Sequence, residues 1–192
     1  METFAPTVLT GRVLPRSRVA AVIAVVGFAA LTAAAAQYRI PLGFTPVPIT
    51  GSTFAVLLSG AALGMRLGAA SQILYVVMGA VGLPVFTDGG SGVEAITGST
   101  GGYLIGFVFG AAAIGKLAER KQDRHIGTMV AAFLAGTSVI YAFGVAGLMV
   151  NAGMDFNNAV LAGVAPFVFG DVLKAAAAGI LLPATWRLLG DH

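Results

Sequence analysis

The stretch Pro166–Pro183, PFVFGDVLKAAAAGILLP, is almost entirely apolar, yet it contains an aspartate and a lysine three residues apart. Its composition suits a helix that spans a membrane, for which about 20 mostly apolar residues are needed. An ionisable side chain inside such a helix costs roughly 2.5–3.5 kcal/mol on insertion scales, so it usually marks a site for a solute or an ion. Asp171 and Lys174 lie on one helix face, where they partly neutralise each other. The pair is therefore either the centre of a binding site or a purely structural ion pair.

The whole chain has the composition of a membrane protein. Of its 192 residues, 57% are hydrophobic and 10% are charged, whereas about 25% of the residues of a soluble domain are charged. A soluble domain of this length would expose too much apolar surface to water. We therefore predict an all-α integral membrane protein surrounded by lipid. The chain has no cysteine, which excludes disulfides, thiolate metal sites and cysteine nucleophiles.

Six apolar stretches predict six transmembrane helices in a single membrane domain. We expect residues 1–17 to form a cytoplasmic N-terminal segment and residues 18–189 to form the six-helix bundle. The second and third helices, each about 14 residues long, are too short to cross a hydrocarbon core of about 30 Å alone. The expected helices cover residues 18–36, 50 or 52 to 63, 68–81, 101–117, 126–150, and 162 or 166 to 189.

The basic residues indicate the orientation, because Lys and Arg collect in cytoplasmic loops. If both termini are cytoplasmic, nine of the eleven basic residues lie on the inner side, and the outer loops contain only Arg39. The remaining one, Lys174, lies inside the last span. This arrangement accounts for the net charge of +3 without a nucleic-acid partner. The nine inner residues are Arg12, Arg16, Arg18, Arg66, Lys116, Arg120, Lys121, Arg124 and Arg187.

Two segments rich in Gly and Pro follow the first and third expected helices. They are IPLGFTPVPITG at residues 40–51 and GLPVFTDGGSGVEAITGSTG at residues 82–101. Irregular backbone persists at membrane depth only where protein or a water-filled cavity covers it. We therefore expect both loops to dip into the outer half of the membrane and cap a substrate cavity, with ordinary outer loops as the alternative. These segments are called the first and second caps below.

A stripe of small residues in the fourth expected helix predicts close packing. Gly98, Gly102, Gly106 and Gly110 recur every four residues, and small residues at this spacing let helix backbones approach closely in membranes. We expect them to pack within the bundle, and docking to another subunit is the alternative.

The charged pair also indicates the kind of ligand. An aspartate accepts hydrogen bonds from N–H groups, and a lysine donates to a carbonyl or a carboxylate. Together they suit a small, mostly apolar solute whose polar head both donates and accepts. The sequence offers no convergent catalytic set, metal-ligand set or nucleotide-binding motif of the kind an enzyme or ATPase needs. We therefore predict a binding subunit of a transporter, without enzyme activity, metal or cofactor. A self-sufficient facilitator or proton-coupled carrier is the alternative.

Four blocks of the sequence resemble the BioY family, the biotin-specific substrate-binding subunits of energy-coupling-factor (ECF) transporters. The resemblance implies a multi-pass protein of a prokaryotic cell membrane that binds biotin near the outer face, with six helices and cytoplasmic termini. The blocks are IPLGFTPVPITGSTFAVLLSGAALG at 40–64, YVVMGAVGLPVF at 75–86, TGGYLIGF at 100–107 and PFVFGDVLKA at 166–175.

The resemblance further implies partners, namely a membrane coupling subunit and two cytoplasmic ATPases. The coupling subunit needs a smooth helix surface, which either Ala20 and Ala24 or Ala30 and Ala34 could provide through their small-residue spacing. Association with a second copy of the chain, and transport without a coupling module, both remain open.

The resemblance assigns the two charged residues to the polar groups of biotin. Asp171 is expected to accept hydrogen bonds from the two ureido N–H groups. Lys174 is expected to meet either the ureido carbonyl or the valerate carboxylate.

Four further residues complete the expected site. Tyr103, in the block TGGYL, is expected to reach into the cavity. Phe44 and Phe86 are expected to pack on the apolar part of biotin, with ordinary packing in the bundle as the alternative. Asp88 lies in the second cap, where family members vary, and its role is the least defined.

Overall fold

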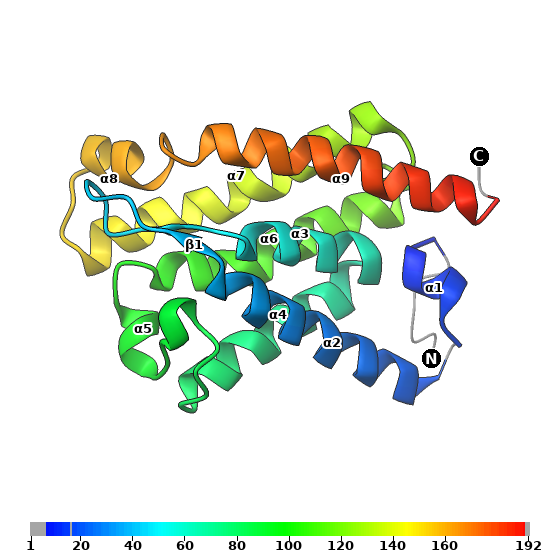
Figure 1. Cartoon of the computed structure of the whole chain (residues 1–192), viewed down its shortest axis with the longest axis horizontal. Coiled ribbons are helices and arrows are strands. Elements are labelled where there is room, and N and C mark those ends of the chain that lie inside the picture. Colours follow the sequence, from blue (N-terminus) through cyan, green and yellow to red (C-terminus); the bar gives the residue numbers. More distant parts are fainter. Residues whose placement is uncertain (1–6, 16, 191–192) are drawn as a thin grey trace.

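The computed structural model describes residues 7–15 and 17–190 as a bundle of helices with one short β-ribbon (Figure 1). Arg16 and residues 1–6, which belong to the expected N-terminal segment, lie outside the described residues. The helices are α1 (Leu9–Val13), α2 (Arg18–Gln37), α3 (Ser52–Leu63), α4 (Met65–Ala80), α5 (Val93–Thr97), α6 (Gly101–Glu119), α7 (Ile126–Asn151), α8 (Phe156–Gly163) and α9 (Val168–Leu188). The 3-10 turn η1 covers Thr87–Gly89, and the strands are β1 (Arg39–Ile40) and β2 (Ile49–Thr50).

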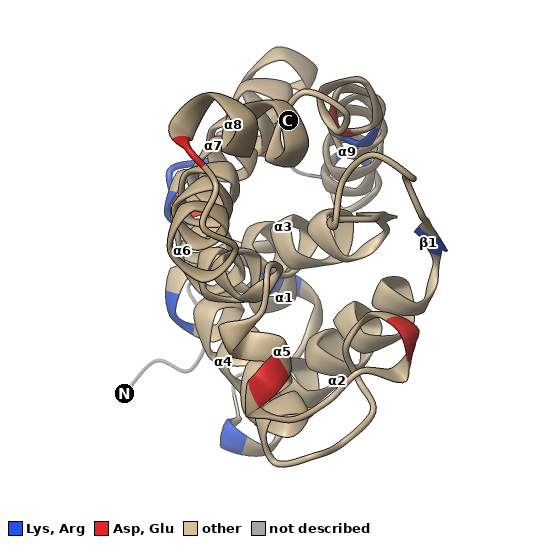
Figure 2. Cartoon of the chain, turned by 90° about the vertical axis from the view of Figure 1, so that its left-hand side faces the viewer, with Lys and Arg blue, Asp and Glu red and all other residues tan. Residues whose placement is uncertain are grey.

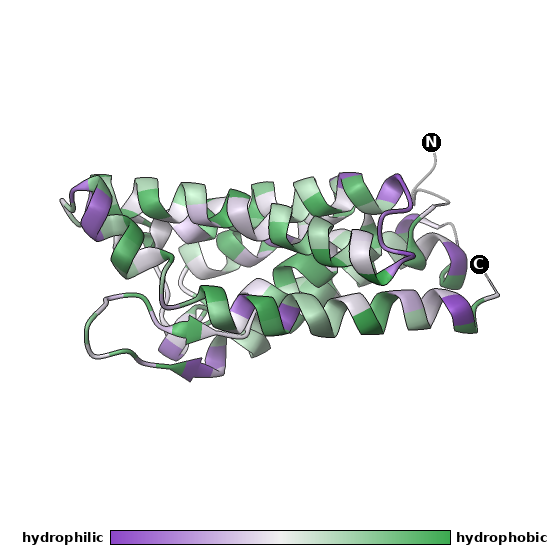
Figure 3. Ribbon diagram, turned by 90° about the horizontal axis from the view of Figure 1, so that it is seen from above, coloured by the Kyte–Doolittle hydropathy of each residue, from purple (hydrophilic) through white to green (hydrophobic). Residues whose placement is uncertain are grey.

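Four of these helices, α2, α6, α7 and α9, are long and apolar enough to cross a membrane. The mostly helical, membrane-spanning character predicted from composition is thus confirmed. Hydrophobic residues dominate along the bundle, and hydrophilic residues gather mainly at its two ends (Figure 3). Helices α3 and α4 have 12 and 16 residues, fewer than the roughly 20 that a span requires. The count of six spans therefore stays a prediction.

A single glycine joins the two short helices. Gly64 has a φ of +83°, in the left-handed region that glycine adopts without a steric penalty. The chain folds back so tightly that a Cβ on Gly68 would lie 2.7 Å from the Cα of Gly60. The carboxylate of Glu119, at the end of α6, accepts the Met65 N–H at 2.9 Å. We expected this helix to begin at residue 68; it begins at Met65, because one left-handed residue completes the turn.

The glycine stripe of α6 packs inside the bundle, as predicted. A Cβ on Gly102 would lie 2.3 Å from the carbonyl oxygen of Phe143, and one on Gly110 would lie 2.6 Å from Ile140. Because α7 occupies the space beside these glycines, they bring the α6 and α7 backbones together. Gly98 precedes the helix as the C-cap of α5 and lies outside this close approach of backbones, although its carbonyl accepts from Asn151 Nδ2, at the end of α7, at 3.0 Å.

Three short helices were not expected from the sequence: α1, α8 and, in the second cap, α5. Within the N-terminal segment, α1 packs against α3: Val8, just before α1, is fully buried, and the Thr10 hydroxyl donates to the Ala62 carbonyl at 2.8 Å. Helix α8 lies before α9, and Asp155 caps it by accepting the Asn158 N–H at 3.0 Å.

The two caps lie at one end of the bundle, which faces the viewer in Figure 2. The first cap contains the antiparallel pair β1–β2. The second contains η1 and α5, so it is not wholly irregular. Acidic residues gather here, with Asp88 in η1, Glu94 in α5 and Asp155 before α8. At the opposite end lie α1, the hairpin between α6 and α7, and the C-terminal end of α9 (Figure 1).

Candidate functional site

A cavity of about 130 Å³ lies beneath the two caps. Helices α3, α4, α6, α7 and α9 and both caps contribute to its wall. Most of the lining is apolar, and a group of polar side chains comes from the first cap, α3, α7 and α9. The apolar and aromatic part of the lining includes Val47, Tyr75, Phe86, Tyr103, Leu104, Phe107 and Phe167, and the polar part includes Thr50, Ser52, Thr53, Tyr141, Asp171 and Lys174.

The charged pair that the sequence singled out lies in this lining. Lys174 Nζ donates to Asp171 Oδ1 at 2.8 Å, and the side chains are 20% and 4% exposed. Asp171 lies in the first turn of α9, where the positive end of the helix dipole favours an anion. Asp171 therefore lies three residues after the start of the helix, close enough to its N-terminus for this interaction.

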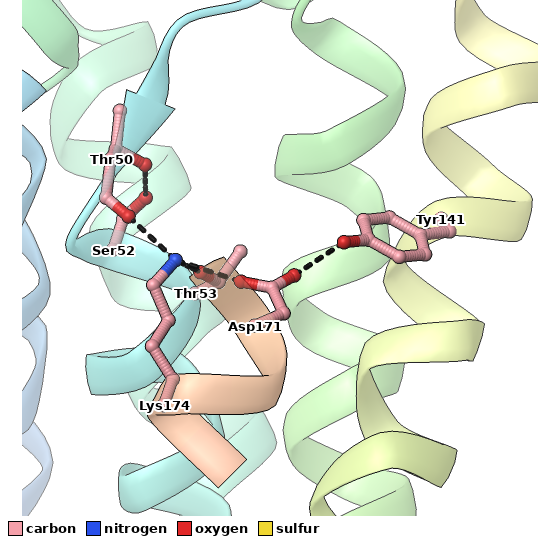
Figure 4. Close-up of polar contacts among 6 residues, drawn as sticks. All are labelled: Thr50, Ser52, Thr53, Tyr141, Asp171 and Lys174. Atoms are coloured by element: carbon pink, nitrogen blue, oxygen red, sulfur yellow. Dashed lines mark hydrogen bonds and ion pairs between the residues drawn. The ribbon is translucent and has the colours of Figure 1, made fainter. Parts of the chain in front are cut away.

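Three further groups complete the cluster (Figure 4). The Tyr141 hydroxyl, from α7, donates to Asp171 Oδ2 at 2.5 Å. Lys174 Nζ also donates to Thr53 Oγ1 at 2.7 Å and to the Thr50 carbonyl at 2.9 Å. An ammonium group has three protons, so each proton of Lys174 has an acceptor. The network joins the first cap, α3, α7 and α9.

The geometry defines what the cluster can bind. A carboxylate has about four acceptor positions, and Lys174 and Tyr141 use one on each oxygen. Asp171 can therefore accept two more hydrogen bonds from N–H groups in the cavity. A carbonyl or carboxylate of a ligand can reach Lys174 only by replacing Thr53 or the Thr50 carbonyl as its acceptor. The site thus suits a solute whose polar head group carries two N–H donors.

Two of the expected aromatic residues lie at the cavity. Tyr103 is 7% exposed, and its hydroxyl donates to the Gly163 carbonyl at 2.7 Å. Because that hydroxyl is engaged between α6 and α8, Tyr103 offers a ligand mainly the face of its ring. Phe86 is 4% exposed and meets Tyr75 edge to face, with 5.5 Å between the ring centroids.

The structure does not bring the other two expected residues to the cavity. Phe44 is 74% exposed and borders a separate shallow depression beside α8, lined also by Met154 and Leu161. Asp88 is not part of the cavity lining and forms an ion pair with Arg39. Both lie in the caps as expected, but on their outer side.

Sequence reasoning missed Tyr141, Thr53, Thr50, Tyr75 and Phe107 as lining residues. Tyr141 carried a usable signal, because it is the one tyrosine in the apolar stretch 126–151 and a buried phenol usually needs a partner. The two threonines gave no such signal in the sequence, because their role depends on how the first cap folds over α9. Among residues 7–15 and 17–190, no three His, Cys, Asp or Glu side chains are grouped so that they could hold a metal ion.

Comparisons with known proteins agree on one family. The family model described as the BioY family matches residues 9–191. The biotin transporter BioY of Thermotoga maritima is 41% identical over 155 residues, covering 80% of this chain and 88% of that protein. The biotin transporter BioY of Rhizobium etli is 38% identical over 149 residues, covering 74% and 79%. A crystal structure of the S-component for biotin from an ECF-type ABC transporter has the same fold, with a TM-score of 0.78 and 24% identity over 91% of this chain and 93% of that one.

Proposed function

This chain belongs to the BioY family, and from that premise we propose that it binds biotin and serves as the substrate-specific subunit of an ECF-type transporter in the cell membrane. The observation that carries the proposal is the buried pair Asp171 and Lys174 in the wall of a mostly apolar cavity. Biotin has a matching distribution of groups, with a polar ureido ring on an apolar bicycle and tail. The role is transport, not catalysis.

In the proposed complex, Asp171 accepts the two ureido N–H groups with the acceptor positions that Lys174 and Tyr141 leave open. Lys174 donates to the ureido carbonyl or the valerate carboxylate in exchange for one of its threonine acceptors. Tyr103 and Phe86 pack on the apolar part of biotin. This assignment is supported by the positions of the four residues in the cavity lining.

We place the cavity at the outer face in a single six-helix membrane domain with both termini in the cytoplasm. The end of the bundle opposite the caps supports this orientation, because Arg12, Lys116 and Arg187 lie in the elements there, and basic residues favour the cytoplasmic side. Helices α3 and α4 are short because the caps fill the outer part of the membrane beside them.

The proposed partners are a membrane coupling subunit and two cytoplasmic ATPases, which would provide the energy for uptake. Of the two small-residue pairs considered for this contact, Ala30 and Ala34 are exposed on α2, whereas Ala24 is buried against the bundle. Of the two pairs, Ala30 and Ala34 are therefore the one that is open to a partner helix.

Uptake of labelled biotin tests the proposal. The chain is expressed in biotin-requiring cells that lack every coupling-factor ATPase, with and without a coupling subunit and its ATPases. We expect concentrative, ATP-dependent uptake only when the partners are present. Concentrative uptake by the chain alone, abolished by a proton uncoupler, would support the proton-coupled carrier instead. No uptake with either arrangement, by protein shown to be in the membrane, would contradict the proposal.

A further inference from the structure

The turn that carries Phe86 is held from outside the cavity by the last residue of α2. Gln37 Nε2 donates to the Phe86 carbonyl at 3.0 Å, and Gln37 Oε1 accepts the Gly89 N–H at 3.1 Å. The same Nε2 also donates to the Ala33 carbonyl at 3.1 Å. These partners fix the orientation of the amide. If it were flipped, its NH₂ group would lie against the Gly89 N–H and its oxygen against the Phe86 carbonyl.

Hydrogen bonds within the turn restrict its backbone conformation. The Phe86 N–H donates to the Gly90 carbonyl at 3.0 Å, and the Gly90 N–H donates to the Thr87 carbonyl at 3.1 Å. Asp88 and Gly89, between them, have φ of +62° and +66°, and the left-handed conformation is disfavoured for residues with a Cβ, although Asp tolerates it better than most. A partner outside the turn therefore helps to maintain this conformation. Arg39, which follows α2, adds an ion pair to Asp88.

On its other side, the turn forms part of the cavity wall. The Phe86 ring packs so closely on α4 that a Cβ on Gly79 would lie 2.0 Å from it, and its edge meets Tyr75. Gln37 is not among the residues that line the cavity. Any effect of Gln37 on a ligand must therefore pass through the turn and Phe86.

We infer that Gln37 is a positioning residue for ligand retention: its amide holds the Phe86 turn closed over the bound solute. The inference rests on the proposed function, because it concerns the departure of biotin from the same cavity. Without Gln37, the Phe86 carbonyl and the Gly89 N–H lose their hydrogen bonds to the side-chain amide. The turn that carries Phe86 then opens more often. The ligand then leaves faster, while the polar cluster on α9 is unchanged.

Stopped-flow or surface-based kinetics on the purified full chain test the inference. Gln37→Met keeps the length of the side chain and removes both polar atoms. We expect biotin to dissociate about five- to tenfold faster, as the loss of one to two net hydrogen bonds implies, with association changed less than about twofold, since affinity changes appear mostly in dissociation. Backbone amide exchange at Gly89 should rise, and the Tm of the unliganded protein should stay unchanged.

The matched control is Gln122→Met, the same substitution in the hairpin at the opposite end of the bundle, which should change neither rate. Arg39→Gln should have a smaller effect than Gln37→Met, because exposed ion pairs contribute little. If the parent binds biotin and Gln37→Met leaves dissociation unchanged, or lowers the Tm and slows association as well, the positioning role is wrong. If the parent itself does not bind biotin, the proposed function fails, and Gly89 amide exchange alone still tests whether Gln37 holds the turn.

Discussion

Lys174 Nζ lies 2.8 Å from Asp171 Oδ1, and both side chains have further partners within the protein. Tyr141 occupies the second oxygen of Asp171, and Thr53 and the Thr50 carbonyl take the other protons of Lys174. The side chains of the cluster thus hold one another in place, so little ordering cost remains when a ligand binds.

The first prediction separates the structural role of the pair from its binding role. Lys174→Ala leaves Asp171 buried without a charge partner, which costs roughly 3 kcal/mol of unfolding free energy, and it should also abolish biotin binding. The double variant Asp171→Asn with Lys174→Met removes both charges and should regain most of the stability without regaining binding. Thermal unfolding in detergent and calorimetry with biotin measure the two effects. A double variant that binds biotin normally would show that the pair is only structural.

The second prediction concerns Tyr141, which sequence reasoning missed. Tyr141→Phe removes the hydrogen bond to Asp171 Oδ2 and leaves the ring in place. Because hydrogen bonds to charged groups contribute about 1.5–3 kcal/mol, we expect biotin affinity to fall roughly ten- to hundredfold. Tyr38→Phe, on a side chain that is 80% exposed, is the control and should leave affinity unchanged. Equal affinity of the Tyr141 variant and the parent would mean that the phenol does not orient the carboxylate.

A third prediction tests the α6–α7 crossing. Gly102→Ala places a methyl group 2.3 Å from the Phe143 carbonyl oxygen, and such overpacking costs about 1–3 kcal/mol. Gly27→Ala is the control, because a Cβ there meets nothing within 4 Å and alanine favours a helix over glycine by up to about 1 kcal/mol. The two alanine variants should therefore shift the Tm in opposite directions. Equal shifts would indicate that the helices do not cross at Gly102.

The fourth prediction is a pH dependence at the hairpin between α6 and α7. Asp123 is 1% exposed and accepts the Trp186 Nε1–H at 2.6 Å. Burial raises the pKa of the Asp123 carboxyl above its ordinary 3.8, although Trp186 and Arg124 act in the opposite direction. The folded protein thus holds this proton more tightly than the unfolded chain. The stabilising contribution is complete below about pH 4 and is lost as the pH rises through the raised pKa.

Asp123→Asn tests this contribution, because the amide oxygen can still accept from Trp186 while the ionisation is removed. Unfolding free energies measured between pH 4 and pH 8 should fall less steeply with rising pH in the variant than in the parent. Asp123→Ala leaves the buried indole N–H without its acceptor and should cost about 1–3 kcal/mol at every pH. Parallel pH profiles of the parent and Asp123→Asn would contradict the assignment.

Sequence reasoning recovered the features that repeat along the chain. The long apolar stretches gave α2, α6, α7 and α9 to within one or two residues at most ends, since hydropathy is a strong signal over 20 residues. The four-residue spacing of glycines correctly predicted the surface of α6 that packs against another helix of the bundle. Helices α1, α5 and α8 were missed, because helices of 5 to 8 residues are too short for periodicity to distinguish them from loops.

The site was only partly predictable, because the positions of the cap residues depend on contacts with distant parts of the chain. Asp171 and Lys174 were evident, because a charge in an apolar span has few explanations. Phe44 and Phe86 looked alike in the sequence, since each is one aromatic residue in a cap rich in Gly and Pro. Their difference arises from long-range contacts: Gln37 turns Phe86 inward, whereas the Thr45 hydroxyl ties the first cap to the Ala162 carbonyl of α8 and leaves Phe44 outside.

Calorimetry of the purified protein with biotin, beside Asp171→Asn, tests the central claim most directly. The variant keeps the size of the side chain and its hydrogen bonds to Tyr141 or Lys174 but removes the charge that the ureido N–H groups are proposed to meet. We predict tight binding to the parent and a loss of at least about a hundredfold in the variant, as expected when a charged hydrogen-bond acceptor is lost. Equal binding by both proteins would contradict the account, and so would the absence of binding by well-folded parent protein.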